Sequence, residues 1–450
     1  MHIIVVGAGV TGIACAHNFL KRGHNVTLIE KASTPNQECS FGMAGFMGPI
    51  SVQMLCAPFK GKAGLASIFA KTRRLGWDVS ISQMKFLRAL ANARSADVWA
   101  ANHESLMTLA RYSVGLTEFH ARLEDLSFEQ VYGLLRVFTN AQAWEEAHKG
   151  ESEKPGEWLT REEASRIDPS LENVPDPFLG CSYLPQELSG NGSYCSKQIQ
   201  AINVSQKNLT MMYHTEVTGL MFDENNKVVG VRTDKGEIAS DAVVLCSNLG
   251  TKPLLDGKLE LPTMQLTGWA VTATIDPMNV PPLHTLIFDN KDLLVTRLGN
   301  RVRVCGRYWL GESSHDMTDK VIEEIYEASC KLLPTAAQWT ESTNWIGKCI
   351  VHPDSLPSCG ETPFEGLYLN ICHGLNGWAL SEGCAELLSD VIEKKTPLNE
   401  YERTGITLDS VITSQLLINI FEKNTPLHDG AVIIRGDRIV SATCYLPLSD

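Results

Sequence analysis

The sequence predicts an α/β protein with a Rossmann-like dinucleotide-binding domain, a second domain built on an antiparallel sheet, and a short α/β segment at the C-terminus. Three observations support this prediction. A strand, a glycine-rich turn and a helix open the chain, and a second junction of the same kind follows near residue 367. Between the two lie segments with the alternation of antiparallel strands.

The opening unit begins with Ile3 to Val6, an apolar run of β-branched residues that is typical of a parallel strand buried on both faces. Gly7, Gly9 and Gly12 follow with GxGxxG spacing, and a helical pattern starts at once. Gly7 allows a tight turn, Gly9 lets a pyrophosphate approach the backbone, and Gly12 lets the helix pack closely on the strand. The helix N-terminus offers N–H groups and partial positive charge to that pyrophosphate.

A second strand, Val26 to Ile29, ends at Glu30, eighteen residues after Gly12. A carboxylate at this place can accept hydrogen bonds from a ribose diol. The alternative is a glycine-rich turn in another kind of α/β protein. Strand, glycines, helix, strand and acid in one unit favour dinucleotide binding.

The length, charge and cysteine content of the chain limit the classes of protein to which it can belong. The chain has 450 residues, enough for two or three domains, and a net charge of -13, which argues against nucleic-acid binding. No run approaches eighteen apolar residues, and the chain opens on a core strand, so we expect neither a transmembrane helix nor a signal peptide. The thirteen cysteines stand singly, without a CxxC pair. They favour reduced thiols in a cytoplasmic protein over a metal or disulfide framework.

The segment from Glu38 to Pro49 is rich in small residues that would let the backbone wrap a flat cofactor, with Ser40 as a hydroxyl donor to a phosphate. An ordinary loop is the alternative. The apolar stretch from Met43 to Ala70 fits either the wall of a substrate channel or a surface in peripheral contact with the inner face of a membrane. Periodicity does not decide between the two.

Helical spacing from Gln83 to Leu126 predicts an insertion that caps the second domain. Thr160 and Glu163 have the spacing of a capping box. The apolar run Ala242 to Cys246 predicts a return to the first sheet, and Thr263 to Tyr308 has the rhythm of an antiparallel sheet. We therefore assign residues 1–80, 191–255 and 346–397 to the dinucleotide-binding domain, 81–190 to a helical and substrate-domain segment, 256–345 to the antiparallel substrate domain, and 398–450 to the C-terminal segment.

The second junction comprises a strand from Leu367 to Ile371, a turn from His373 to Gly377 and a helix from Trp378 to Ile392. Two such junctions on one sheet suit a long dinucleotide, one for its pyrophosphate and one for its reactive ring. From Met1 to about Lys395 the chain resembles the D-amino acid dehydrogenase small-subunit branch of the D-amino acid oxidase-like flavoproteins. The matching pieces include VVGAGVTGIACAHNFLKRGHNVTLIEK, ECSFGMAGFMGP, LPQELSG, NRVRVCGR and LNICHGLNGWAL.

This resemblance implies FAD as cofactor. It places the glycines of the first turn at the pyrophosphate, Glu30 at the ribose, Val217 at the adenine, and Gly374 to Trp378 at the pyrimidine edge of the flavin. The residues predicted to bind FAD are Val6, Gly7, Gly9, Val10, Thr11, Gly12, Glu30, Lys31, Ser40, Ala44, Gly45, Val217, Ser247, Gly374, Leu375, Asn376, Gly377 and Trp378.

The resemblance also implies oxidation of a D-amino acid or related amine by hydride transfer to flavin N5, with a quinone, an electron carrier or oxygen as the electron acceptor. The family holds the substrate carboxylate with an arginine, but Cys349 stands at that position here. A thiol does not replace a bidentate guanidinium. We therefore predict that Lys348, Arg307 or His352 supplies the cation.

From about Leu398 to Asp450 the chain resembles the catalytic domain of membrane-linked bacterial diadenylate cyclases, including the motif Asp429-Gly430-Ala431. The resemblance implies that Asp429 helps to bind a metal ion and to activate a ribose hydroxyl. The family's Arg-His-Arg motif and the upstream half of its domain are missing from this sequence. We therefore expect a junction near Thr396 to Tyr401 between a flavoprotein and an incomplete, inactive cyclase piece, arising from fusion, recombination or an error in gene assembly. Cyclic di-AMP synthesis is the alternative function.

Overall fold

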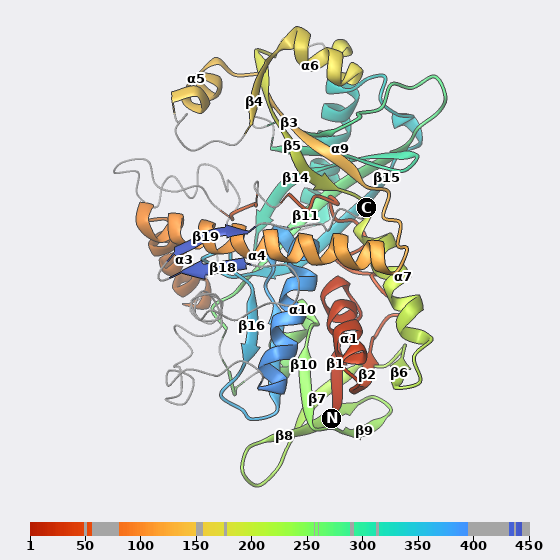
Figure 1. The fold of residues 1–450 in the computed structure, drawn as a ribbon, viewed down its shortest axis with the longest axis vertical. Helices are drawn as coiled ribbons and strands as arrows, with labels where there is room; N and C mark the ends of the chain where they lie inside the picture. The colour runs from red at the N-terminus through yellow and green to blue at the C-terminus, as the bar shows by residue number, and fades with distance from the viewer. Residues whose placement is uncertain are drawn as a thin grey trace, which may run out of the picture.

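The computed structural model describes residues 1–48, 52–55, 81–149, 156–174, 178–255, 257–259, 261–288, 292–311, 315–394, 432–435 and 438–442. Two β-sheets dominate it, one in the lower half of Figure 1 beside the N-terminus and one in the upper half. The α/β class with a Rossmann-like domain and a second sheet is confirmed. Within the described residues no helix is both long and apolar enough to cross a membrane.

The lower sheet has six strands whose bounds lie far apart in the sequence. Their order is β16 (Ser358–Glu361), β17 (Leu367–Ile371), β10 (Ala242–Leu245), β1 (His2–Val6), β2 (Asn25–Ile29) and β6 (Leu209–Met212). All neighbours are parallel except β16 and β17. The predicted return of the chain at Ala242 is confirmed, since Ile3 pairs with Ala242 and Val6 with Leu245.

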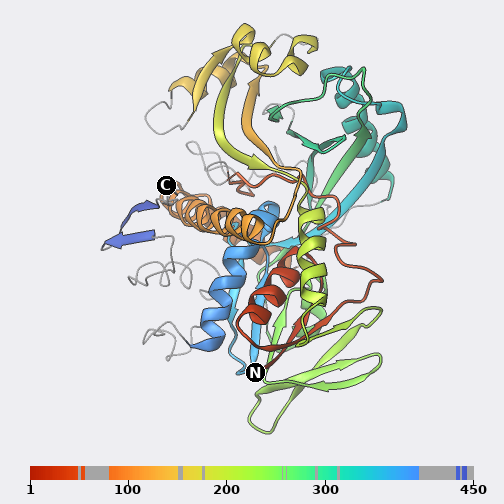
Figure 2. The same cartoon turned by 45° about the vertical axis from the view of Figure 1, so that its right-hand side comes forward.

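The two faces of this sheet are covered by different elements, and β1 alternates between them. Ile3 and Val5 pack with α1 (Val10–Lys21), α7 (Gly192–Val204) and α10 (Gly377–Glu393). Ile4 and Val6 pack with a three-stranded sheet of β7 (Val217–Phe222), β8 (Val228–Thr233) and β9 (Gly236–Ala239). Figure 2 shows α1, α7 and α10 together on one side of the strands. Burial on both faces explains the unbroken apolar run of β1.

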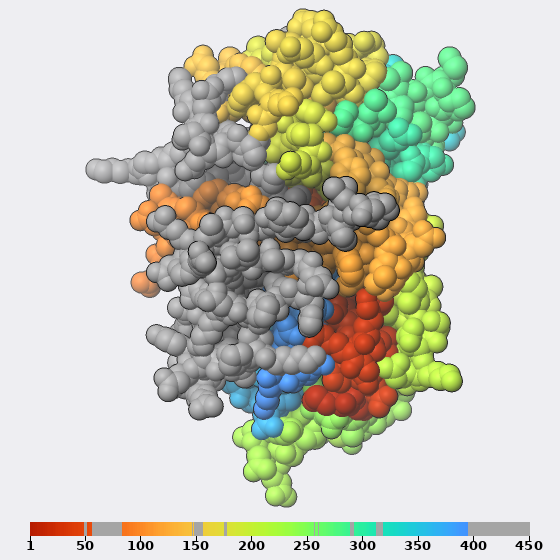
Figure 3. Space-filling view, in the orientation of Figure 1, coloured from red at the N-terminus to blue at the C-terminus, as the bar shows by residue number. Residues whose placement is uncertain are grey.

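The predicted helical insertion consists of α3 (Ile81–Ala93) and α4 (Ala96–Leu123), but its packing differs from the expectation. Leu106, Leu109 and Val114 of α4 belong to the core that contains β1 and α10. The Gly383 N–H of α10 also donates to Ser113 Oγ at 2.9 Å. Thus α4 covers the dinucleotide half rather than capping the second sheet, and its surface lies between the two halves in Figure 3. The spacing of apolar residues predicts which face of a helix is buried, but it does not predict which element packs against that face.

The upper sheet has eight strands. Their order is β15 (Thr343–Val351), β11 (Met264–Thr274), β14 (Arg301–Leu310), β13 (Leu293–Leu298), β12 (Thr285–Phe288), β3 (Val131–Phe138), β5 (Gly180–Ser189) and β4 (Glu157–Thr160). It is antiparallel throughout except that β12 and β3 run parallel. On one face α9 (His315–Leu332) packs through Val321 and Ile325. The other face looks toward the dinucleotide half.

Short elements complete the described chain. They are α5 (Ala141–Lys149), α6 (Arg161–Ile167), η2 (Pro169–Asn173), η3 (Asn248–Gly250), α8 (Thr251–Leu255), η5 (Trp339–Glu341) and η6 (Gly374–Asn376). The capping box at α6 is confirmed, because Thr160 Oγ1 accepts the Glu163 N–H and the Glu163 carboxylate accepts the Thr160 N–H. In the C-terminal segment β18 (Val432–Arg435) and β19 (Arg438–Ala442) pair antiparallel.

The closest backbone approach in the opening unit is at Gly12. A Cβ there would lie 1.9 Å from the Gly7 carbonyl oxygen. Because backbone atoms cannot yield as a side chain can, we expect Gly12→Ala to destabilise the fold by about 3 kcal/mol. The midpoint of urea unfolding measures this loss. Gly219→Ala is the matched control, since a Cβ there meets no atom within 4 Å. Equal midpoints for the two variants would contradict the close packing of α1 on β1.

Candidate active site

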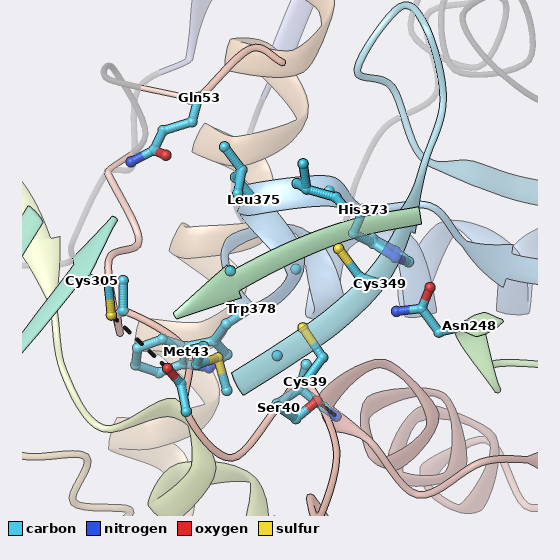
Figure 4. Close-up of a pocket in the computed structure, with 18 of the residues that line it drawn as sticks. Cys39, Ser40, Met43, Gln53, Asn248, Cys305, Cys349, His373, Leu375 and Trp378 are labelled. Carbon is cyan, nitrogen blue, oxygen red and sulfur yellow. Dashed lines mark hydrogen bonds between the residues drawn. The ribbon is translucent and has the colours of Figure 1, made fainter. Parts of the chain in front are cut away.

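An elongated cavity lies between the two halves, with an empty volume of about 1100 Å³ that includes its opening to solvent. Figure 4 shows side chains from both halves facing into it. One end is bounded by the N-terminus of α1 at Val10 and Thr11, and the other by Leu266 and Gly268 of β11 and by Tyr308 of β14.

The glycine-rich turn forms the first end of this cavity. Gly7 has φ +102°, a conformation that L side chains rarely adopt, and a Cβ there would lie 3.0 Å from Ser247 Cα. A Cβ at Gly9 would meet only Ser40 Oγ, at 3.1 Å. Ser40 Oγ in turn accepts the Val10 N–H at 3.2 Å. The N-cap residue of α1 is Gly9, which has no side chain to cap the helix, and the first turn holds no acidic residue, so this end is electrostatically suited to an anion.

Glu30 stabilises the backbone beside this turn. One carboxylate oxygen accepts the Ala8 N–H at 2.7 Å and the other accepts the Ala32 N–H at 2.9 Å. Each oxygen keeps further acceptor capacity, so both contacts are compatible with ribose hydroxyls. The neighbouring Lys31 is exposed and forms an ion pair with Glu38 at 3.2 Å.

The small-residue segment after β2 runs along the cavity and is held by its carbonyl groups. Arg303 of β14, which is buried, donates to the Phe41 and Met43 carbonyls at 3.3 and 2.9 Å. Burial lowers the pKa of Arg303 from its usual value. Thr296 Oγ1 donates to the Ala44 carbonyl at 2.6 Å. The second sheet therefore fixes the segment that the sequence predicts to wrap a cofactor.

Gly45 makes the closest approach in that segment. It has φ +76°, and a Cβ there would lie 2.1 Å from the Gly190 carbonyl oxygen. Its own carbonyl accepts the Gly190 N–H at 2.7 Å. Only glycine fits this contact between the segment and the end of β5.

The second junction forms the cavity floor. Cys372 and Gly374 have φ +62° and +58°, which turns the chain sharply from β17 into η6 and α10. The Asn376 amide pairs with the backbone of Gln53, donating to its carbonyl at 2.8 Å and accepting its N–H at 2.9 Å. The Trp378 ring packs edge-on against Phe128 with 5.7 Å between centroids. Strain of this kind in non-glycine residues is typical of functional sites.

The opposite wall is the face of β15 that carries Trp345, Gly347 and Cys349. Because side chains of a strand alternate, Ile346 and Lys348 face the other way, and both are exposed. Cys349 therefore faces the cavity, at the position where the resemblance expects an arginine.

Nine of the eighteen predicted FAD-binding residues line the cavity. Those that line the cavity are Val10, Thr11, Ser40, Ala44, Gly45, Gly374, Leu375, Gly377 and Trp378. Val6 is buried in the sheet core, Val217 packs below the sheet with Ile4, and Ser247 Oγ is hydrogen bonded to Thr251 Oγ1 at 3.0 Å. The roles assigned to these residues stay predictions.

The three predicted substrate cations do not come together at the cavity. Lys348 is exposed on the opposite face of β15. Arg307 lies 3.9 Å from a carboxylate oxygen of Glu324, and His352 Nδ1 lies 2.9 Å from an oxygen of Asp354. Among the described residues that line the cavity there is no lysine or arginine. The predicted metal ligand Asp429 lies outside the described residues.

Several residues that line the cavity were not identified as site residues from the sequence. They are Cys39, Gln53, Asn248, Tyr308, Trp345 and His373, among others. Alternation along β15 would have identified Trp345 from Cys349. The others depend on contacts between distant segments, such as the Asn248 side chain, which accepts the Ile350 N–H at 2.8 Å.

Comparison with known proteins gives two family matches. Residues 2–391 match the family described as FAD dependent oxidoreductase, and residues 389–450 match the family described as DisA bacterial checkpoint controller nucleotide-binding. The second match covers the segment that the sequence predicts to resemble a cyclase domain, and its description supports nucleotide binding only.

Solved structures similar to this chain share its fold at low identity. Glycine oxidase from Bacillus cereus ATCC 14579 is 20% identical, with a TM-score of 0.66 over 92% of this chain and 99% of that chain. Glycine oxidase from Geobacillus kaustophilus is 22% identical, with a TM-score of 0.64 over 90% and 98%. Iminodiacetate oxidase from Chelativorans sp. BNC1 is 16% identical, with a TM-score of 0.65 over 90% and 98%.

The described residues fit FAD. The uncapped N-terminus of α1 suits its pyrophosphate, the free acceptor capacity of Glu30 suits a ribose, and the lining glycines leave room for a flat ring along the cavity. The family match covers most of the chain. This chain belongs to the FAD dependent oxidoreductase family, and its cofactor is FAD.

Proposed function

We propose that the chain oxidises a D-amino acid or a related amine. The bound cofactor would supply, at flavin N5, an acceptor for a hydride from the substrate α-carbon. The observation that best supports this proposal is the cavity that runs from the dinucleotide turn to the inner face of the second sheet. The similar solved structures include two glycine oxidases and an iminodiacetate oxidase. These support a small amino or imino compound as the substrate.

The chain's own contribution to this reaction is orientation and exclusion of water. Leu266, Trp345 and Tyr308 form a largely apolar wall opposite the second junction. A substrate held between that wall and the flavin needs no nucleophile and no acid-base triad. The backbone contacts of Arg303 hold the cofactor segment rigidly, which preserves the distance between the reacting atoms.

Recognition of a carboxylate is the part of the proposal that departs from the family pattern. Cys349 faces the cavity, and the described lining residues offer hydroxyl and amide groups such as Tyr308 and Gln53. These bind a carboxylate less strongly than a guanidinium does. We therefore expect the substrate to be an amine, or an amino acid whose carboxylate is held weakly. We do not expect a compound whose binding depends on an ion pair between its carboxylate and the protein.

The test is anaerobic bleaching of the bound flavin by matched pairs, each consisting of a D-amino acid and the amine that lacks its carboxylate. We expect at least one member of such a pair to bleach the flavin, with little loss of kcat/KM when the carboxylate is removed. L-amino acids serve as stereochemical controls. A flavin that no amino acid or amine reduces would contradict the proposal. Reoxidation by quinone, electron carrier or oxygen then identifies the acceptor.

A second candidate, synthesis of cyclic di-AMP from ATP, rests on the nucleotide-binding match of residues 389–450. Asp429 would bind the metal ion in this reaction. Cyclic di-AMP formed with ATP and manganese, and lost in Asp429→Asn, would support it. The flavin proposal rests on a match to residues 2–391 and is therefore preferred.

Gly9→Val tests the dinucleotide turn. The branched side chain occupies the space that the pyrophosphate needs, so we expect FAD to be lost. The fold should survive, because the nearest atom to an added Cβ is the side-chain Oγ of Ser40. The ratio of flavin to protein and the circular dichroism spectrum measure the two effects. Gly219→Val is the control that keeps its flavin. Full flavin content in Gly9→Val would refute the placement of the pyrophosphate.

Cys349→Arg restores the family cation on the cavity face of β15. We expect kcat/KM for D-amino acids to rise about tenfold relative to the matched amines, since a charge-assisted bond contributes about 1.5 to 3 kcal/mol. Lys348→Ala is the matched control on the exposed face and should leave the ratio unchanged. A ratio that changes in Lys348→Ala and not in Cys349→Arg would show that Lys348 reaches the substrate.

Deletion of residues 402–450 removes most of the segment that matches the nucleotide-binding family and keeps the whole segment that matches the flavoprotein family. Every described residue that lines the cavity lies between Val10 and Trp378, so we expect the truncated chain to keep its flavin absorbance spectrum. The measurement is the spectrum of the purified protein at equal concentration. Loss of flavin on truncation would mean that the C-terminal segment supports the cofactor site.

A further inference from the structure

Two cysteines from distant parts of the sequence face the same part of the cavity. Cys39 lies in the segment after β2, and Cys349 lies on β15. A Cβ added at Gly347 would be 3.5 Å from Cys39 Sγ and 3.7 Å from Cys39 Cα. Gly347 and Cys349 share one face of β15, so Cys39 covers that face beside Cys349. Figure 4 draws both sulfur atoms beside the strand, in the cavity lining.

The surroundings of the two thiols differ in a way that matters for their chemistry. The neighbouring Cys349 thiol lowers the pKa of Cys39. The same contact, together with burial, raises the pKa of Cys349 well above its usual value. Cys39 is also the more accessible of the two, being partly exposed where Cys349 is buried. A thiolate is the attacking species in disulfide exchange, so Cys39 reacts first.

We propose that Cys39 and Cys349 form a redox-active dithiol that exchanges with small organic disulfides and links two parts of the cavity wall when oxidised. The Cys39 thiolate attacks the disulfide, forms a mixed disulfide and releases one thiolate. Cys349 then loses its proton and attacks Cys39 Sγ, which forms the internal disulfide and releases the second thiolate. The two released thiolates take up the two protons, and the small disulfide is reduced by the two electrons that the cysteines lose.

The bond would join the cofactor segment to β15 across the cavity wall. Its effect does not depend on which substrate the enzyme oxidises, because the bond changes the wall itself. It also gives a chemical role to Cys349, at the position where the resemblance expects an arginine.

The test uses the full FAD-loaded chain with 2-hydroxyethyl disulfide, followed by blocking of free thiols and peptide mapping by mass spectrometry. We expect a Cys39–Cys349 crosslink, reversed by dithiothreitol, and a shift of the flavin absorbance spectrum that follows the same time course. Cys305→Ser is the matched control. Its thiol also lines the cavity, but contacts the Gly42 carbonyl at 3.9 Å, so this variant should still form the crosslink.

Cys39→Ser and Cys349→Ser should each abolish the crosslink and the spectral shift. A second probe, phenylarsine oxide, binds adjacent thiol pairs, and each single variant should bind it about 100-fold more weakly than the unchanged chain. Absence of the crosslink in the flavin-loaded chain, pairing of either cysteine with a different one, or equal arsenical affinity in the variants would each overturn the proposal.

Discussion

The close approach of α1 to the turn after β1 is the constraint on which the rest of the structure depends. A Cβ at Gly12 would overlap the Gly7 carbonyl oxygen, so only glycine lets the helix start where it does. That position presents the N-terminus of α1 to the cavity, and it sets the face of α1 against which α7 and α10 pack. The Glu30 carboxylate then ties the turn to β2 through the Ala8 and Ala32 N–H groups.

The cavity exists because the chain leaves the parallel sheet and returns to it. β1, β10 and β17 bring their carboxyl ends together, as expected for a parallel α/β sheet, while β11, β14 and β15 supply the facing wall. The segment that carries Ser40 and Ala44 belongs to both halves. It follows β2 but is held by Arg303 and Thr296 of the second sheet, so cofactor and substrate would share a wall that neither sheet forms alone.

Much of this arrangement could be predicted from the sequence, because buried parallel strands and glycine turns have strong local signals. The strands near Ile3, Ala242 and Leu367 and the helix after Gly377 are confirmed. The packing of α4 on α10 could not be predicted, because the apolar residues along one face of a helix do not indicate which element will cover that face. Nor could the orientation of Cys349 or its proximity to Cys39, because both depend on strand register and on a contact across more than 300 residues of chain.

The central claim is that the cavity between the two halves holds FAD without a covalent bond. The most direct test is to purify the full chain, precipitate it with acid and measure the flavin in the supernatant against the protein in the pellet. One FAD per chain, released into the supernatant, is the result that this arrangement of turn, cavity and second junction predicts. A colourless chain that takes up no added FAD would contradict it.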